Sequence, residues 1–171
     1  MTSASEAGAP PQGRFWRAYE ATVNGLAVTL FAAMVIVTAA GVFFRYVLNA
    51  ALPWAEEADR YLFIWLSFVA AAITMRHQAH IAVDILVRNF KPAARDWAAL
   101  LSHACILLFV GTVFWASQRV IDVTSDTRTT ATDIPMSWVY LAVPVGCALI
   151  AIEVLRLATH TVRRMTRSAT P

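Results

Sequence analysis

Residues 21–44 have the sequence ATVNGLAVTLFAAMVIVTAAGVFF, 24 consecutive positions without a charged side chain. As an α-helix this stretch is roughly 36 Å long, which exceeds the ~30 Å hydrocarbon thickness of a bilayer. The apolar segment of a secretory signal is only about 7–15 residues long, whereas this one continues through Phe43 and Phe44. We therefore predict that residues 21–44 form a membrane-spanning helix and are not a cleaved signal.

Three further apolar stretches follow along the chain. Residues 97–118 and 134–152 are uncharged and long enough to cross the membrane. Residues 61–75 are uncharged but too few, so this helix must begin earlier and include the charged segment after Pro53, a residue that suits a helix start. We predict four spans, at about residues 21–44, 54–75, 97–118 and 134–155.

The composition agrees with a polytopic membrane protein. Of the 171 residues, 58% are hydrophobic and 15% are charged, against about 45–50% and 25% in soluble domains. Such a chain is not a disordered protein, a nucleic-acid module or a typical soluble enzyme. We predict an all-α fold with one transmembrane domain over residues 14–165, a disordered N-terminal tail at 1–13 and a C-terminal tail at 166–171.

The segment between the second and third spans has a different pattern. Its apolar residues occupy a broad arc of a helical projection, and His80, Asp84, Arg88 and Lys91 fill a narrow polar wedge. This amphipathic segment is too short to span, so we predict an interfacial helix at about residues 80–91, ending near Pro92.

The distribution of basic residues predicts the orientation. The formal net charge is +3, and ten of the fourteen Lys and Arg residues lie in the N-terminal segment, the connection between the second and third spans, and the C-terminal segment. The positive-inside rule then places both termini in the cytoplasm. Anionic lipid headgroups, rather than nucleic acid, explain the basic residues at the ends of the apolar stretches.

Groups that could carry transport chemistry are scarce. No Asp, Glu, Lys or Arg lies in the middle of a predicted span, whereas transporters place such groups at membrane depth. All four histidines, His77, His80, His103 and His160, lie towards the predicted cytoplasmic side of the membrane. Only His103 lies well inside a span. Haem ligation or a metal bound by His77 and His80 is the alternative to ordinary headgroup and hydrogen-bond contacts.

No enzyme site or cofactor site is indicated. The sequence contains no nucleophile motif and no glycine-rich phosphate loop. Cys105 and Cys147 lie within apolar stretches and are interpreted as apolar packing residues. Glu56 and Glu57 could form a catalytic acid pair, but a helix N-terminus that binds acids through its dipole explains them as well. We therefore predict a chain that is not an enzyme and binds no cofactor.

The start of the second span combines charged and aromatic residues. Glu56 and Arg60 are an i,i+4 pair of opposite charge, and Glu57 lies beside them. The acids could anchor either Arg60 or Arg45. Two interpretations remain open for these charges: a cluster that fixes the bend between the first two helices and their docking on a partner, or a solvated helix start. Trp54, Tyr61 and Trp65 cluster on the opposite side, where they could pack on a partner or form an interfacial aromatic belt.

Four segments in the same order resemble the DctQ family, the small membrane subunits of tripartite ATP-independent periplasmic (TRAP) transporters. They are Trp54 to Trp65, which fits W-x-E-E-x-x-R-x-x-x-x-W, the preceding Phe44-Arg45-Tyr46-Val47, the stretch from Arg76 through His80 to Asp84, and Ile134 to Tyr140. The resemblance covers about residues 15–160.

The resemblance implies an accessory, scaffold subunit in the bacterial inner membrane. Its partners would be a large membrane subunit on a separate chain, which carries the sodium and substrate sites, and a periplasmic binding protein that delivers an organic acid. The candidate structural or interface residues are Arg45, Trp54, Glu56, Glu57, Arg60, Tyr61, Trp65, Arg76, Asp84, Pro135, Trp138 and Pro144. The alternatives are a haem- or quinone-linked anchor subunit, an independent small four-helix transporter, and a scaffold unrelated to transport.

Overall fold

A computed structural model describes residues 14–87 and 92–168 of the chain. The predicted disordered tail at residues 1–13 lies outside the described residues. The same holds for Arg88 and Lys91 at the end of the predicted interfacial helix, and for residues 169–171.

The described residues form an all-α protein. The elements are α1 (Arg14–Tyr46), α2 (Pro53–Val87), α3 (Pro92–Thr124), α4 (Met136–Tyr140) and α5 (Ala142–Ser168). Within residues 14–87 and 92–168, four helical segments are long and apolar enough to cross a membrane, which confirms the predicted four-span architecture. These segments are Arg14–Tyr46, Pro53–Arg76, Asp96–Thr124 and Met136–Arg163.

Proline residues explain several helix boundaries. Pro53 and Pro92 are the first residues of α2 and α3, where the missing N–H is not needed. Pro144 lies in the first turn of α5 and cannot donate a hydrogen bond to the carbonyl of Tyr140, four residues earlier. The helix is interrupted just there, at Leu141 between α4 and α5.

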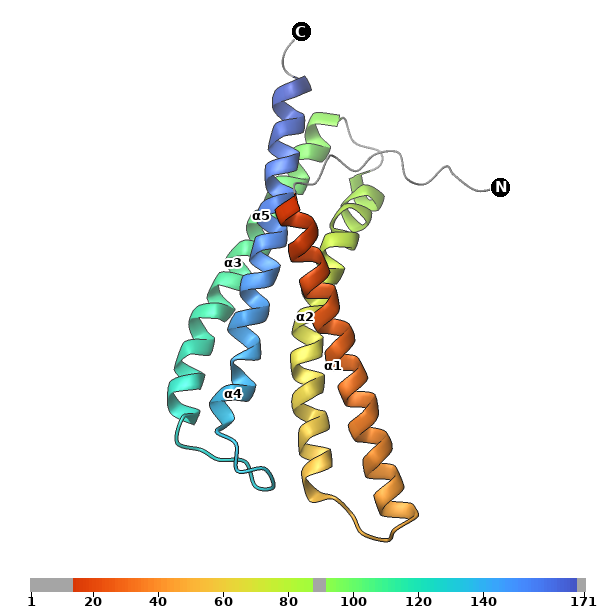
Figure 1. Ribbon diagram of the computed structural model, residues 1–171. Helices are drawn as coiled ribbons and strands as arrows, with labels where there is room; N and C mark the ends of the chain where they lie inside the picture. Colours follow the sequence, from red (N-terminus) through yellow and green to blue (C-terminus); the bar gives the residue numbers. More distant parts are fainter. Residues whose placement is uncertain (1–13, 88–91, 169–171) are drawn as a thin grey trace, which may run out of the picture.

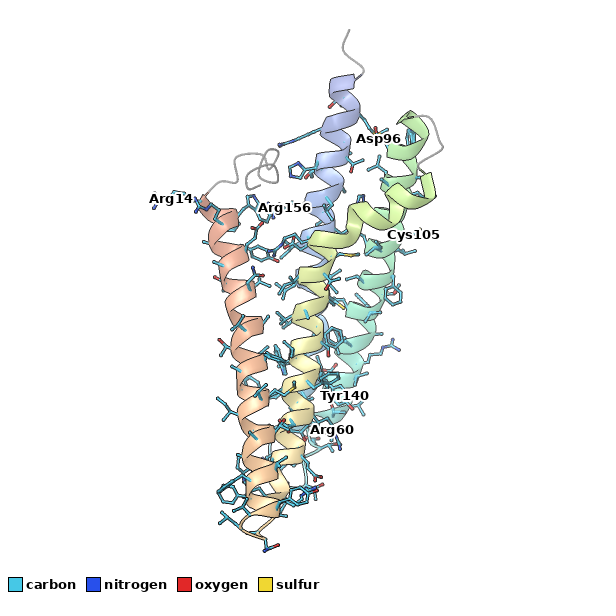
Figure 2. The ribbon with its side chains drawn as sticks, turned by 90° about the vertical axis from the view of Figure 1, so that its right-hand side faces the viewer. Arg14, Arg60, Asp96, Cys105, Tyr140 and Arg156 are labelled. Carbon is cyan, nitrogen blue, oxygen red and sulfur yellow. The ribbon has the colours of Figure 1, made fainter. Side chains whose placement is uncertain are left out.

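The segment predicted as a separate interfacial helix is a continuation of α2. The spanning part of α2 ends at Arg76, yet the helix runs on to Val87 without interruption. Figure 2 shows that this last part of α2 turns away from the axis of the spanning part. The predicted C-terminal tail begins at residue 166, and α5 continues as a helix to Ser168.

The long helices form a row rather than a square bundle. Along the row α1 packs on α2, α2 packs on α5, and α5 packs on α3. α1 begins and α5 ends at one end of the molecule, which we name the terminal end (Figure 1). The turn between α1 and α2 and the loop between α3 and α4 lie at the opposite end, which we name the loop end (Figure 1).

The buried core lies mainly where α2 meets α5, and its residues are small. Val69 and Ala72 of α2 and Ala142 and Val154 of α5 are each at most 1% exposed. Gly146 of α5 lies so close to Phe68 of α2 that an added Cβ would be 2.5 Å from the Phe68 Cβ atom. Small residues let membrane helices approach closely, where dispersion forces rather than hydrophobic burial hold them together.

The outer helices of the row expose large apolar side chains. Examples are Phe31 and Ile36 on α1 and Leu108 and Trp115 on α3, which are 54–74% exposed. In water this surface would drive aggregation, whereas lipid tails or another membrane subunit can cover it. The row therefore presents an apolar surface along both edges and has its polar contacts at the two ends.

Candidate functional site

α1 and α2 are joined at the loop end by two polar contacts. Arg45, in the last turn of α1, forms an ion pair with Glu56 in the first turn of α2. Nearby, the Thr38 hydroxyl donates a hydrogen bond of 2.8 Å to Asp59 Oδ2. Arg60 is exposed and forms no ion pair within the described residues. Of the two arginines that the sequence offers as partners, Glu56 therefore binds Arg45 across the hairpin and not Arg60.

A pocket of about 200 Å³ lies between α1 and α2 at the loop end, lined in part by Thr38, Arg45, Glu56 and Asp59. In its wall, Arg45 and Glu56 bind each other and Asp59 Oδ2 accepts from Thr38, whereas Asp59 Oδ1 is buried without a hydrogen-bond partner among the described residues. The pocket is therefore part of the hairpin contact, and its lining does not indicate a particular ligand.

Glu57 connects the start of α2 to the loop between α3 and α4. Its Oε2 atom accepts hydrogen bonds from the backbone N–H groups of Ala131 and Thr132 at 3.0 and 2.9 Å, and from the Thr132 hydroxyl at 3.1 Å. Its Oε1 atom accepts a 2.5 Å hydrogen bond from the Tyr61 hydroxyl. Three of these four donors belong to the loop, so the Glu57 carboxylate fixes the loop against α2. The loop and Glu57 are far apart in the sequence.

The same loop is also ordered by its own hydrogen bonds. The Thr129 N–H donates to the carbonyl of Ile134 at 3.0 Å, and the Ile134 N–H donates to the Thr129 hydroxyl at 3.0 Å. Arg128 and Pro135 form an isolated antiparallel bridge, so Pro135 lies at the base of the loop immediately before α4. The Thr-rich connection is therefore a structured loop.

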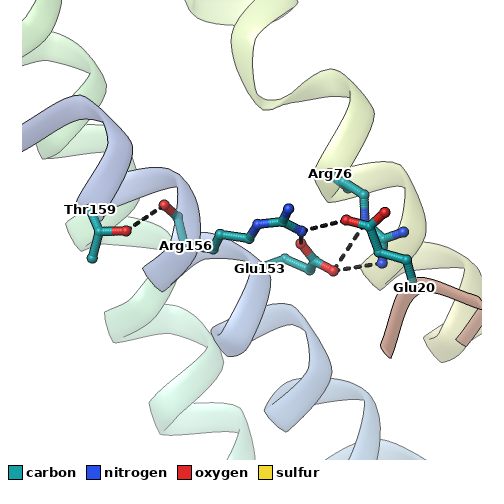
Figure 3. A network of polar contacts seen from close by, with 5 residues as sticks. All are labelled: Glu20, Arg76, Glu153, Arg156 and Thr159. Carbon is teal, nitrogen blue, oxygen red and sulfur yellow. Dashed lines mark hydrogen bonds and ion pairs between the residues drawn. The ribbon is translucent and has the colours of Figure 1, made fainter. Parts of the chain in front are cut away.

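Four charged side chains from three helices meet near the terminal end (Figure 3). Arg76 of α2 donates to Glu153 Oε1 of α5 from Nε at 3.1 Å and from Nη2 at 2.7 Å. Arg156 of α5 donates to Glu20 Oε1 of α1 at 2.6 Å, and the same Nη1 atom is 3.9 Å from Glu153 Oε2. We name Glu20, Arg76, Glu153 and Arg156 the terminal-end network.

The terminal-end network is shielded from solvent. The Glu153 side chain is 1% exposed, both arginine side chains are 14% exposed, and Glu20 is 21% exposed. With two carboxylates and two guanidinium groups, the network is formally neutral, which is what burial of charge requires.

Two aromatic side chains of α1 cover the network. The Arg156 guanidinium carbon lies 4.6 Å from the centre of the Trp16 ring, and that of Arg76 lies 5.9 Å from the centre of the Tyr19 ring. These distances fall within the range of cation–π attraction. α1 therefore contributes both a carboxylate and two aromatic faces to a cluster centred on α5.

A comparison with protein families fits this architecture. The family model described as tripartite ATP-independent periplasmic transporters, DctQ component, matches residues 34–167 of the chain. The chain belongs to the DctQ family. As a member of this family with four membrane-spanning helices, it is a transport component of the inner membrane.

Curated relatives of this DctQ-family chain include TRAP permeases of three names. The isethionate TRAP transporter permease protein DctMQ of Oleidesulfovibrio alaskensis is 29% identical over 116 residues, which are 67% of this chain and 18% of the relative. The C4-dicarboxylate TRAP transporter small permease protein DctQ of Vibrio cholerae is 31% identical over 154 residues, covering 74% and 65%. The sialic acid TRAP transporter small permease protein SiaQ of Vibrio cholerae is 24% identical over 121 residues, covering 71% and 70%. The chain thus spans less than two thirds of the length of the first two relatives.

The other predicted site residues of this DctQ-family chain are spread over the molecule. Trp54 and Trp138, both close to the loop end, are 43% and 62% exposed. Trp65 is half-buried, and Pro144 is buried in the first turn of α5. For Asp84, His77 and His80 the structure describes the helix and not the side chains, so the predictions for these side chains lie outside the described part.

Sequence reasoning missed Glu20 and Glu153. Glu20 directly precedes the apolar stretch that begins at Ala21, and Glu153 directly follows the stretch that ends at Ile152. Arg156 was counted only as a basic residue of the C-terminal segment. The i,i+3 spacing of Glu153 and Arg156 near the end of a span was the available pattern, because an acid this close to the membrane interior requires a cation.

Proposed function

We propose that this DctQ-family chain is the static, non-conducting subunit of a TRAP transporter. It works with a large membrane subunit on a separate chain and with a periplasmic solute-binding protein, and it supports uptake of an organic acid driven by a sodium gradient. It carries out no catalysis of its own. The DctMQ and SiaQ relatives, named as TRAP permease proteins, support this assignment.

The observation that carries the proposal is the absence of charge from the middle of every spanning stretch in the sequence. Residues 21–44, 61–75, 97–118 and 134–152 contain no Asp, Glu, Lys or Arg. A sodium ion or an organic anion crossing the bilayer needs such groups, or broken helices, at mid-membrane depth. Arg45 binds Glu56 at the loop end, and the four charges of the terminal-end network bind one another. The solute and its coupling ion therefore pass through the partner.

The orientation of the chain is part of the proposal. Both termini face the cytoplasm, so the loop end faces the periplasm and the bent end of α2 lies along the cytoplasmic surface. The excess of basic residues in the N-terminal, 76–95 and C-terminal segments supports this orientation. Cysteine accessibility tests this orientation. A cysteine at Thr130 should react with a membrane-impermeant maleimide added to intact spheroplasts. A cysteine at Ile81 should not show the inaccessibility of a residue buried at mid-membrane depth.

The loop end contributes to assembly with the large subunit. Arg60, Trp54 and Trp138 are exposed there, and they can contact a partner without disturbing the contacts of Glu56 and Glu57. Replacing Arg60 with Ala should lower co-purification of a tagged large subunit. The matched control is Arg119→Ala, an exposed arginine on α3. Equal co-purification by both variants would contradict a role for Arg60 in assembly.

Reconstitution tests the proposed function as a whole. Vesicles should contain this chain alone, its large partner subunit alone, or both, with the binding protein and a labelled C4-dicarboxylate, sialic acid or isethionate on the outside. We expect solute accumulation in a sodium gradient when both subunits are present. Accumulation by vesicles that contain only this chain would overturn the proposal. A haem absorption band in the purified chain would instead favour an electron-transfer anchor.

A further inference from the structure

The packing of α1 against the rest of the molecule is unusually one-sided. α1 packs on α2, yet within the described residues no Cα atom of α1 lies within 8 Å of a Cα atom of α3 or α5. Val23 is the one buried residue of α1. Since lipid tails are as apolar as the exposed face of α1, apolar contacts alone give the helix little reason to prefer one rotation or tilt on α2.

Polar contacts can fix the rotation and tilt of α1, which the apolar contacts alone do not determine. At the loop end, α1 is held to α2 by Arg45 with Glu56 and by Thr38 with Asp59. At the terminal end, the 2.6 Å hydrogen bond from Arg156 to Glu20 reaches from α5 across to α1. This contact connects two helices that are not adjacent in the row, so it can fix the tilt of α1 relative to α5.

The rest of the terminal-end network sets the position of Arg156. Glu153 lies one turn before Arg156 on the same helix, and its carboxylate also binds Arg76 of α2. The guanidinium of Arg156 is further confined by the Trp16 ring, which belongs to α1. Arg156 is thus held by its own helix and by α1 at once, while Arg76 ties α2 to the same carboxylate.

We propose that the terminal-end network is a register lock, in which Glu20 is the positioning residue that fixes the tilt and rotation of α1 relative to α5. Buried ion pairs often add little stability compared with apolar residues of similar size, but they can select one arrangement among several of similar energy. The lock gives the edge of the row formed by α1 a single orientation, and this role is independent of the transported solute.

The test measures the distance between α1 and α5 directly in the full chain. Spin labels at Val28 on α1 and Val162 on α5, both exposed, report this distance by double electron–electron resonance after Cys105 and Cys147 have been replaced with Ala. A second label pair, Leu101 on α3 with Val162, is the internal control, because both sites are exposed and neither contacts the network.

We expect a narrow α1–α5 distance distribution in the parent and a broadened or shifted one in Glu20→Leu, with the α3–α5 distribution unchanged. Thr22→Leu is the matched control, since Thr22 is exposed on α1 and its hydroxyl binds only the carbonyl of Ala18 in its own helix. If Glu20→Leu does not accumulate in the membrane, Glu20→Gln removes the charge while keeping the shape and carries the same comparison. An unchanged α1–α5 distribution, or equal broadening of both label pairs, would overturn the register lock.

Discussion

At the terminal end, a carboxylate with only 1% of its side chain exposed binds guanidinium groups from two helices. At the loop end, Arg45 and Glu56 form the same kind of ion pair, but their side chains are 48% and 69% exposed. Water can solvate either member of the exposed pair when its partner is lost, whereas the buried members depend on one another. The comparison indicates that identical chemical pairs at the two ends differ in how much of the fold depends on them.

The largest expected effect is that of Glu153→Leu. The substitution leaves Arg76 without its carboxylate partner in a buried position, and breaking a buried pair costs about 3–5 kcal/mol. We expect a clear loss of thermal stability of the purified full chain in detergent, measured by the loss of the monodisperse peak in size-exclusion chromatography after heating. The balanced variant Arg76→Leu with Glu153→Leu removes both charges and should recover most of the loss. A single variant as stable as the double variant would show that the buried pair is not interdependent.

Apolar packing between the two ends gives the next largest effect. A Cβ atom at Gly146 would be 2.5 Å from Phe68 Cβ, so Gly146→Ala should force α5 away from α2 and cost about 1–3 kcal/mol by overpacking. Gly25→Ala is the matched control, because nothing lies within 4 Å of its added Cβ and alanine is the better helix former. The same heating assay measures both variants. Equal stability would mean that α2 and α5 can separate at no cost, and that the ends alone hold the row together.

The helices themselves could be predicted from the sequence, whereas the terminal-end network could not. Apolar length fixes a membrane span because a helix must cover the hydrocarbon thickness, and this rule does not depend on tertiary contacts. The separate interfacial helix at residues 80–91 was predicted from its polar wedge, but no proline or glycine lies between Arg76 and Pro92 to break the helix. α2 therefore continues through the polar segment and bends instead of ending.

Pairing between charges from different helices depends on the order of the helices in space, which the sequence pattern does not contain. The sequence left both Arg60, one helical turn away, and Arg45 open as partners of the acids, and the arrangement of α1 beside α2 selects Arg45 for Glu56. Likewise, Glu20 and Arg156 are separated by 136 positions. Apolar stretches were delimited by their bordering charges, so Glu20 and Glu153 were treated as borders and their contacts were missed.

Loss of Glu57 should loosen one loop with a small effect on the whole chain. Three of its four hydrogen-bond donors come from Ala131 and Thr132, so Glu57→Ala leaves the backbone N–H groups of the loop to bind water. We expect faster hydrogen exchange at residues 127–134 and little change in thermal stability. Slow exchange in this loop after the substitution would show that its own hydrogen bonds, such as those of Thr129, order it without Glu57.

The smallest effect is expected for Glu56→Ala. The carboxylate and its partner Arg45 are both exposed, so water replaces the lost contact on each side and side-chain entropy is regained. Thermal stability should be unchanged within error, and any difference from the parent should vanish as salt screens the exposed charges. Glu57→Ala, one residue away on the same helix, serves as the comparison because its loss should affect the loop. A marked, salt-independent destabilisation by Glu56→Ala would mean that the Arg45–Glu56 pair is buried in the membrane, and that the two ends of the row are more alike than their exposure indicates.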